Sequence, residues 1–152
     1  IQKNFSRIMS LKDGTNKMSK SDPSDLSRIN LTDNKDQIVN KVKKAKTDND
    51  LLPSDYTNLC ERPEVKNLMG IYSSLNNQSL NNSINEFSGK NFSEFKLKLT
   101  DLLVEKISPI SAEINKLQKD SSYIDSILKD GGERANTIAS KKVKEIKRII
   151  GF

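Results

Sequence analysis

The sequence predicts a mainly α-helical protein whose first part differs from the rest. Beyond Leu31, apolar residues recur at the three- and four-residue spacing of amphipathic helices, with no convincing strand pattern. Before Leu31, a short apolar run over residues 7–11 predicts a strand that leads into a loop rich in Lys and Ser. Nucleotide-binding sheets deliver their ligand loops in this way. With 34% hydrophobic and 30% charged residues among 152, the composition is that of a globular chain.

The next elements follow from local signals. Residues 29–31 alternate and predict a brief extended piece. Thr32 or Asp33 can cap a helix whose apolar side chains recur at helical spacing. The stretch over residues 48–62, interrupted by a proline, predicts a loop, and Pro63 suits the first turn of the following helix.

Further helices follow after an asparagine-rich turn. Ser79 can cap a short helix that Gly89 ends. A long helix then opens at Ser93, and Pro109 inside it removes a backbone hydrogen bond and should kink it.

The last part of the chain predicts two helices. A short helix is expected over residues 123–128, and Gly131-Gly132 should break the chain after it. The final helix carries apolar residues at three- and four-residue spacing and should close at Gly151.

The loop over residues 17–21 (KMSKS) is the stretch with the clearest chemistry. Lys17 and Lys20 alternate with small hydroxyl residues and follow a turn-prone Asp-Gly pair. A Lys is a point charge on a flexible stem, which suits a loop that closes on phosphate and then releases product. Ser19 and Ser21 add hydroxyl donors and let backbone N–H groups approach the phosphates. Such loops also occur as plain solvated surface, so the motif alone leaves both interpretations open.

This run resembles the KMSKS loop of class I aminoacyl-tRNA synthetases, and its flanks narrow the resemblance to the tryptophanyl-tRNA synthetases. Residues 7–11 (RIMSL) and the Asp22-Pro23 pair resemble that branch, whereas the tyrosyl relatives usually continue with Gly-Asn. Looser matches extend over nearly the whole chain, at residues 44–48, 67–68, 71–73, 87–90, 107–110 and 132–136.

The resemblance implies a fold and an activity. Residues 1–31 would be the end of a Rossmann-type nucleotide-binding fold, and residues 32–152 a module of five or six helices that engages the tRNA anticodon. The activity would be ATP-dependent conversion of tryptophan to its adenylate, followed by transfer to tRNA. Lys17 and Lys20 would be catalytic, with Ile8 and Met18 near the adenine. The full set of expected ATP-binding residues is Ile8, Lys17, Met18, Ser19, Lys20 and Ser21.

The sequence contains no histidine and a single cysteine, Cys60. This excludes His-based triads, His-containing zinc sites, thiolate clusters and an intramolecular disulfide. It also excludes the HIGH motif, which class I synthetases place in the first part of their nucleotide fold. We therefore expect a C-terminal portion of a longer enzyme that is catalytically incomplete by itself.

The net charge of +6 fits a polyanionic partner. The excess gathers in residues 41–46 and 141–148, where a basic helix face could bind RNA phosphates or simply complement the helix dipole. By resemblance, the partners are the tRNA for tryptophan, L-tryptophan, ATP with its Mg²⁺ and a second copy in a homodimer. We expect no structural metal, no membrane partner and a cytoplasmic location, although a mitochondrial matrix is compatible.

Two alternatives stay open. The chain could belong to another class I synthetase, most plausibly the tyrosyl enzyme, because the pocket that selects the amino acid is not evident in this sequence. It could also be a non-catalytic helical RNA-binding module whose Lys-Ser loop is incidental.

Overall fold

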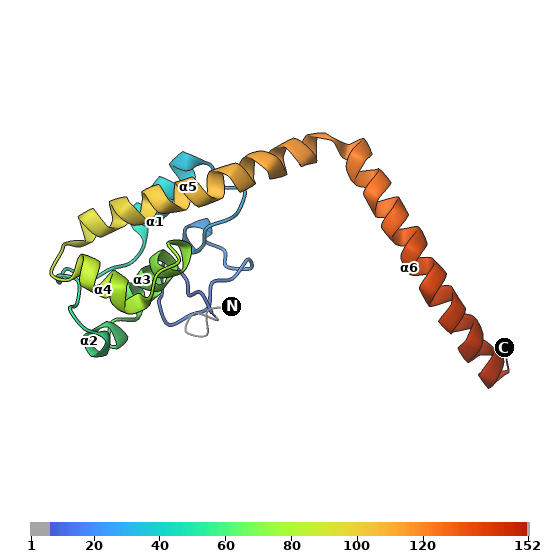
Figure 1. Cartoon of the computed structure of the whole chain (residues 1–152), viewed down its shortest axis with the longest axis horizontal. Helices are drawn as coiled ribbons and strands as arrows, with labels where there is room; N and C mark the ends of the chain where they lie inside the picture. Colours follow the sequence, from blue (N-terminus) through green and yellow to red (C-terminus); the bar gives the residue numbers. More distant parts are fainter. Residues whose placement is uncertain (1–6, 152) are drawn as a thin grey trace. The chain divides into compact units, whose positions relative to one another are not determined.

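The structure is a computed structural model that describes residues 7–151. It is mainly α-helical, as the sequence predicts, and the chain divides into two compact units, Ile1–Ser111 and Ala112–Phe152. None of the helices within the described part is long and apolar enough to cross a membrane. Its helices are η1 (Asp25–Ser27), α1 (Lys35–Lys44), α2 (Tyr56–Cys60), α3 (Pro63–Leu75), α4 (Leu80–Phe87), α5 (Phe92–Lys119) and α6 (Ser121–Ile150) (Figure 1).

The predicted strand over residues 7–11 is wrong. In the described part of the chain this run forms only an isolated antiparallel bridge between Met9 and Lys17. A strand needs a continuous hydrogen-bonded ladder, and the segment turns back on itself too soon to supply one. Residues 29–31 form no strand either, and the brief extended piece expected there stays a prediction. The assignment of residues 1–31 to a nucleotide-binding fold therefore stays a prediction, and so does the boundary after it.

Helix α1 is capped by Asn34, whereas Thr32 or Asp33 was predicted. The Asn34 side chain accepts a hydrogen bond from Gln37 N at 2.9 Å, and the Gln37 side chain accepts one from Asn34 N at 2.8 Å. This reciprocal pair is a capping box. Asp33 is not the cap because its buried carboxylate accepts from Lys41 Nζ at 2.6 Å.

The segment predicted as a loop over residues 48–62 contains the short helix α2. The Asp55 carboxylate caps it by accepting from Asn58 N at 2.9 Å, and the fully buried Leu59 anchors it to the core. Five residues are too few to display a repeating apolar pattern, so no helical periodicity marks this segment. Helix α3 begins at Pro63, as predicted.

Helices α3, α4 and α5 share the core of the first unit, and Figure 1 shows α5 in front of α1, with α3 and α4 below α5 in this view. Tyr72, Phe87 and Phe95 form an edge-to-face aromatic cluster, with ring centroids 4.9 to 5.9 Å apart. Ser79 caps α4 and Gly89, at a φ of 71°, follows its end, both as predicted. The other large, fully buried apolar side chains are Ile38, Val42, Leu59, Val65, Leu68, Met69 and Leu99.

Helix α6 runs unbroken through Gly131 and Gly132, so the predicted break is wrong. A glycine inside a helix costs only about 1 kcal/mol relative to alanine, which the flanking helical residues can offset. Helix α5 continues through Pro109, and the kink predicted there stays a prediction. Helix α6 ends at Gly151, as predicted, where φ is 85° and the N–H donates to Lys147 O. Among its described residues none is buried.

Candidate functional site

The predicted loop borders a hollow of about 770 Å³ in the first unit. The hollow combines cationic side chains with an apolar rim, a pairing that suits a charged ligand with a flat apolar part. Of the six residues predicted to bind ATP, Ser21 does not line it. The lining residues are Arg7, Ile8, Lys17, Met18, Ser19, Lys20, Arg28, Ile29, Asn30 and Leu31.

Lys17 and Lys20 are exposed beside this hollow. Within residues 7–151, neither lysine forms an ion pair with a carboxylate. The loop closes locally instead, because Ser19 Oγ accepts from Ser21 N at 3.2 Å. Neither ammonium group is therefore paired with a carboxylate of this part of the chain, which leaves both able to bind a polyanion.

The upstream side of the loop is fixed to helix α3. The buried Asn67 side chain accepts from Met9 N at 2.9 Å and donates to Met9 O at 2.8 Å. Gly14 lies so close to α3 that a Cβ there would be 2.4 Å from the carbonyl carbon of Pro63. Leu11, 2% exposed, places this stem in the hydrophobic core. The chain that enters the loop is thus positioned by residues of α3, which lie 49 and 58 positions further along the sequence.

The downstream side of the loop is held by Arg28. Its Nη1 donates to Asp22 O at 3.0 Å, its Nη2 pairs with Asp25 Oδ1 at 3.1 Å, and its Nε donates to Asn30 at 3.3 Å. Hydrogen bonds from Lys41 and then Asn30 hold the pKa of the Asp25 carboxyl below its usual value. Arg28 is therefore a cation whose charge is already matched, unlike the two loop lysines.

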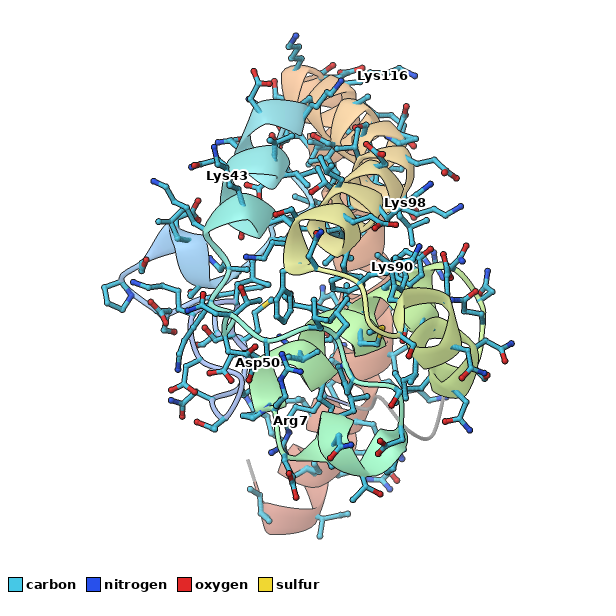
Figure 2. The ribbon with its side chains drawn as sticks, turned by 90° about the vertical axis from the view of Figure 1, so that its left-hand side faces the viewer. Arg7, Lys43, Asp50, Lys90, Lys98 and Lys116 are labelled. Atoms are coloured by element: carbon cyan, nitrogen blue, oxygen red, sulfur yellow. The ribbon has the colours of Figure 1, made fainter. Side chains whose placement is uncertain are left out.

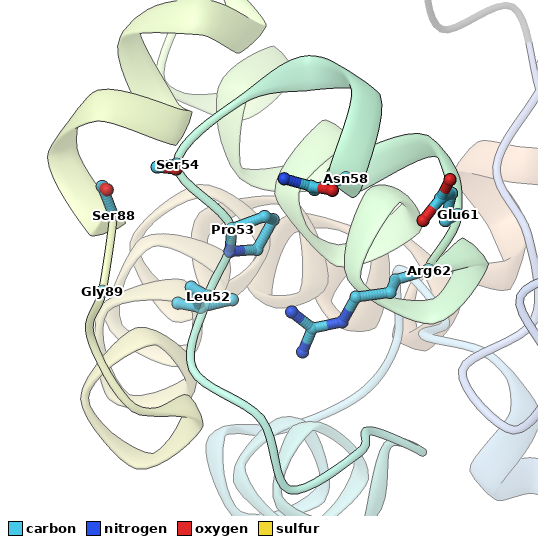
Figure 3. A pocket seen from close by; sticks show the side chains of 8 residues that line it. All are labelled: Leu52, Pro53, Ser54, Asn58, Glu61, Arg62, Ser88 and Gly89. Carbon is cyan, nitrogen blue, oxygen red and sulfur yellow. The ribbon is translucent and has the colours of Figure 1, made fainter.

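A second, smaller hollow of about 380 Å³ lies between α2 and the turn after α4. Figure 3 shows Arg62 extending towards Leu52 and Pro53 along this hollow. The guanidinium donates to both carboxylate oxygens of Asp48 and to Leu51 O, the latter at 2.7 Å. Arg62 therefore holds residues 48–51 next to the start of α3, and its charge is already paired with the Asp48 carboxylate.

The two predicted basic clusters differ in the structure. In the first, Lys41 is buried and Lys46 pairs with Glu64 at 2.8 Å, so residues 41–46 do not form one continuous cationic face. Figure 2 shows Lys43 on α1 and Lys98 on α5 among the side chains at the surface of this unit. The second cluster lies on α6, where residues 141, 142, 144, 147 and 148 are all exposed. Within residues 7–151, no group of three His, Cys, Asp or Glu side chains could hold a metal ion.

Comparison with known proteins shows which family the chain resembles. The family model described as "tRNA synthetases class I (W and Y)" matches residues 2–107. The chain belongs to this family. That match includes the whole KMSKS loop, both of its stems and helices α1 to α4. The family resemblance predicted from the sequence is confirmed.

Its relatives within the family are proteins named for tryptophan. The chain is 53% identical over 146 residues to a tryptophan–tRNA ligase of Mesorhizobium japonicum, covering 96% of this chain and 41% of the relative. It is 44% identical over 152 residues to one of Rickettsia felis, covering 100% of this chain and 46% of the relative. The chain therefore spans less than half the length of these relatives.

A solved structure also resembles this chain. The crystal structure of tryptophanyl-tRNA synthetase from Mycoplasma pneumoniae matches it with a TM-score of 0.59 and 29% identity. The match covers 72% of this chain and 35% of that chain. The helical architecture is thus one that a synthetase of this family adopts.

Two residues of the site were not predicted from the sequence. Asn67 clamps the upstream stem. Residues 67–68 belong to the family resemblance, but no neighbouring residue indicates this contact, because its partner Met9 is 58 positions away. Arg28 offered a weak signal, since it is the first basic residue after the loop. Its role depends on Asp25 and Lys41, which only the fold brings together.

Proposed function

We propose that this chain is the C-terminal part of a tryptophan–tRNA ligase. The observation that carries the proposal is the hollow beside the KMSKS loop, where Lys17 and Lys20 stand without carboxylate partners in the described part of the chain. Because the chain belongs to the W and Y synthetase family, we interpret this hollow as the ATP site. The tryptophan–tRNA ligases at 53% identity favour tryptophan over tyrosine as the amino acid.

In the proposed reaction, the tryptophan carboxylate attacks the α-phosphate of ATP. A bond forms between carboxylate oxygen and phosphorus, the bond to the bridging oxygen breaks, and pyrophosphate leaves with the electron pair. Lys17 and Lys20 offset the negative charge on the transferring phosphoryl group and on the departing pyrophosphate. Ser19 and Ser21 supply hydroxyl groups near the phosphates, while Ile8 and Met18 contact the adenine.

The second step passes the amino acid to tRNA. A hydroxyl of the terminal ribose attacks the carbonyl carbon of the adenylate, and AMP leaves. Mg²⁺ enters with ATP as part of the substrate. We assign residues 1–31 to the catalytic fold and residues 32–152 to the module that engages the anticodon region. The proposed enzyme is a cytoplasmic homodimer, and the part of it that carries the HIGH motif precedes this chain.

Amino-acid-dependent ATP–pyrophosphate exchange tests the proposal. The longest native form of the protein is assayed with tryptophan and with tyrosine in parallel, and the 152-residue chain serves as the control. We expect exchange with tryptophan only, and none from the shorter chain. Exchange with tyrosine would assign the protein to the tyrosyl branch. No exchange from a folded full-length protein would favour a non-catalytic RNA-binding module.

A further inference from the structure

Arg28 differs from the other cations of the hollow because its donors are already used. Its Nη1 donates to Asp22 O at 3.0 Å and approaches Ser24 O at 3.4 Å, and its Nη2 pairs with Asp25 at 3.1 Å. These three partners lie on the segment that leaves the KMSKS loop. A planar fork of N–H donors can hold several acceptors at once in fixed directions, which an ammonium group cannot do. Arg28 therefore holds backbone, and it is not a free cation that awaits a ligand.

Asp25 connects this arginine to helix α1. While Asp25 Oδ1 faces Arg28, its Oδ2 lies 2.7 Å from Lys41 Nζ. Lys41 is 2% exposed and also pairs with Asp33, 3% exposed, at 2.6 Å. A buried charge pair is costly to break, because removal of one partner leaves the other desolvated. The contacts that start at Arg28 therefore lead through Asp25 to the buried Lys41–Asp33 ion pair inside the first unit.

The two sides of the loop are consequently held by different helices. Asn67 of α3 holds the upstream stem at Met9, and Lys41 of α1 holds the downstream stem through Asp25 and Arg28. Between these anchors, Met18 N donates to Ile8 O at 3.1 Å on the upstream stem, and Ser21 N donates to Ser19 Oγ at 3.2 Å within the loop. Leu11 N also donates to Ser27 O at 2.8 Å, which joins the two stems next to Arg28. Its path past the hollow therefore depends on both anchors.

We propose that Arg28 is a positioning residue for the phosphate loop. It fixes the downstream stem against α1 through Asp25 and so keeps Lys17 and Lys20 beside the hollow. For the step on ATP this inference rests on the proposed function, whereas the anchoring itself does not. Loss of the Arg28 contacts leaves the upstream anchor at Asn67 intact and frees only one side of the loop.

Limited trypsin digestion under native conditions tests the anchoring, because trypsin cleaves after lysine. The longest native form is compared with its Arg28→Gln and Asp25→Asn variants. The Asp25→Asn change leaves the buried ion pair between Lys41 and Asp33 in place. We expect cleavage after Lys20 to accelerate about 5-fold in both, since the open state gains population when a charged hydrogen bond is lost. The control is Asp130→Asn, which removes the carboxylate of an exposed pair on α6. It should leave cleavage at the loop unchanged.

A reference site separates loosening of the loop from general unfolding. If cleavage after Lys66 in α3 accelerates as much as cleavage after Lys20, the variants merely unfold and the proposal is overturned. Unchanged cleavage after Lys20 overturns it equally. Arg28→Lys should fall between wild type and Arg28→Gln, because it keeps the charge opposite Asp25 but loses the fork.

The step on ATP is tested by the kinetics of exchange in the same variants. Arg28→Gln should raise the KM for ATP or lower kcat by about 10-fold, with the KM for tryptophan unchanged, because only the phosphate loop has moved. Faster cleavage with unchanged ATP kinetics would support the anchor and contradict the assigned role of the loop. Slower exchange with unchanged cleavage would contradict the anchor alone.

Discussion

Replacement of Asn67 by alanine tests whether the upstream stem of the loop depends on helix α3. The change removes two hydrogen bonds to Met9, to its N–H at 2.9 Å and its C=O at 2.8 Å. Met9 is partly buried, so each lost bond should cost about 1 kcal/mol and the pair about 2 kcal/mol of unfolding free energy.

The measurement is urea unfolding of the longest native form, followed by circular dichroism at 222 nm. Asn76→Ala provides a matched control, because Asn76 is an exposed asparagine just after α3 whose side chain donates to Gln78 Oε1 at 3.0 Å, a contact between two neighbouring surface residues. We expect the control to stay within about 0.5 kcal/mol of wild type. If Asn67→Ala costs no more than Asn76→Ala, the clamp on Met9 contributes nothing and the reasoning is refuted.

Three further predictions concern stability. Gly14→Ala should lower the free energy of unfolding by about 2–3 kcal/mol, because its Cβ would meet the Pro63 backbone; equal stability in urea would contradict that close approach. Gly132→Ala should raise helicity and stabilise α6 by up to about 1 kcal/mol, since its Cβ meets nothing within 4 Å; unchanged ellipticity on heating would count against a continuous helix. The hydrogen bond from Arg62 holds the pKa of Asp48 below its usual value of 3.8, so this carboxylate stabilises the fold above its unfolded pKa and loses that effect as pH falls through the folded pKa. Asp48→Asn should therefore destabilise at pH 7 more than at pH 3 in urea titrations, and equal losses would rule out the linkage.

The sequence predicted those elements whose signals lie within a few residues of each other. Pro63 opens a helix and Ser79 caps one because both act on their own first turn. The prediction of a cap at Asp33 failed because Lys41, eight positions on, takes its carboxylate. The break at Gly131 failed for a different reason, since glycine weakens a helix without being able to forbid it.

The candidate site also contains residues that the sequence predicts and residues that it does not. The loop was found from the sequence because its lysines and serines are contiguous, and all of the predicted ATP-binding residues except Ser21 line the hollow. Their roles on ATP stay predictions. The anchors were not predicted, because the fold alone brings Asn67 to Met9 and Lys41 to Asp25, the partner of Arg28.

Single-turnover formation of tryptophanyl-adenylate in Lys20→Ala tests the central claim most directly. Lys12→Ala is the matched control, because Lys12 is also exposed on the stem but does not line the hollow. Loss of one preorganised charge at the transferring phosphate should slow adenylate formation by about 100-fold or more, while tryptophan binding changes much less. Lys12→Ala should match wild type. Adenylate formation at the wild-type rate in Lys20→Ala would contradict the assigned role of the loop.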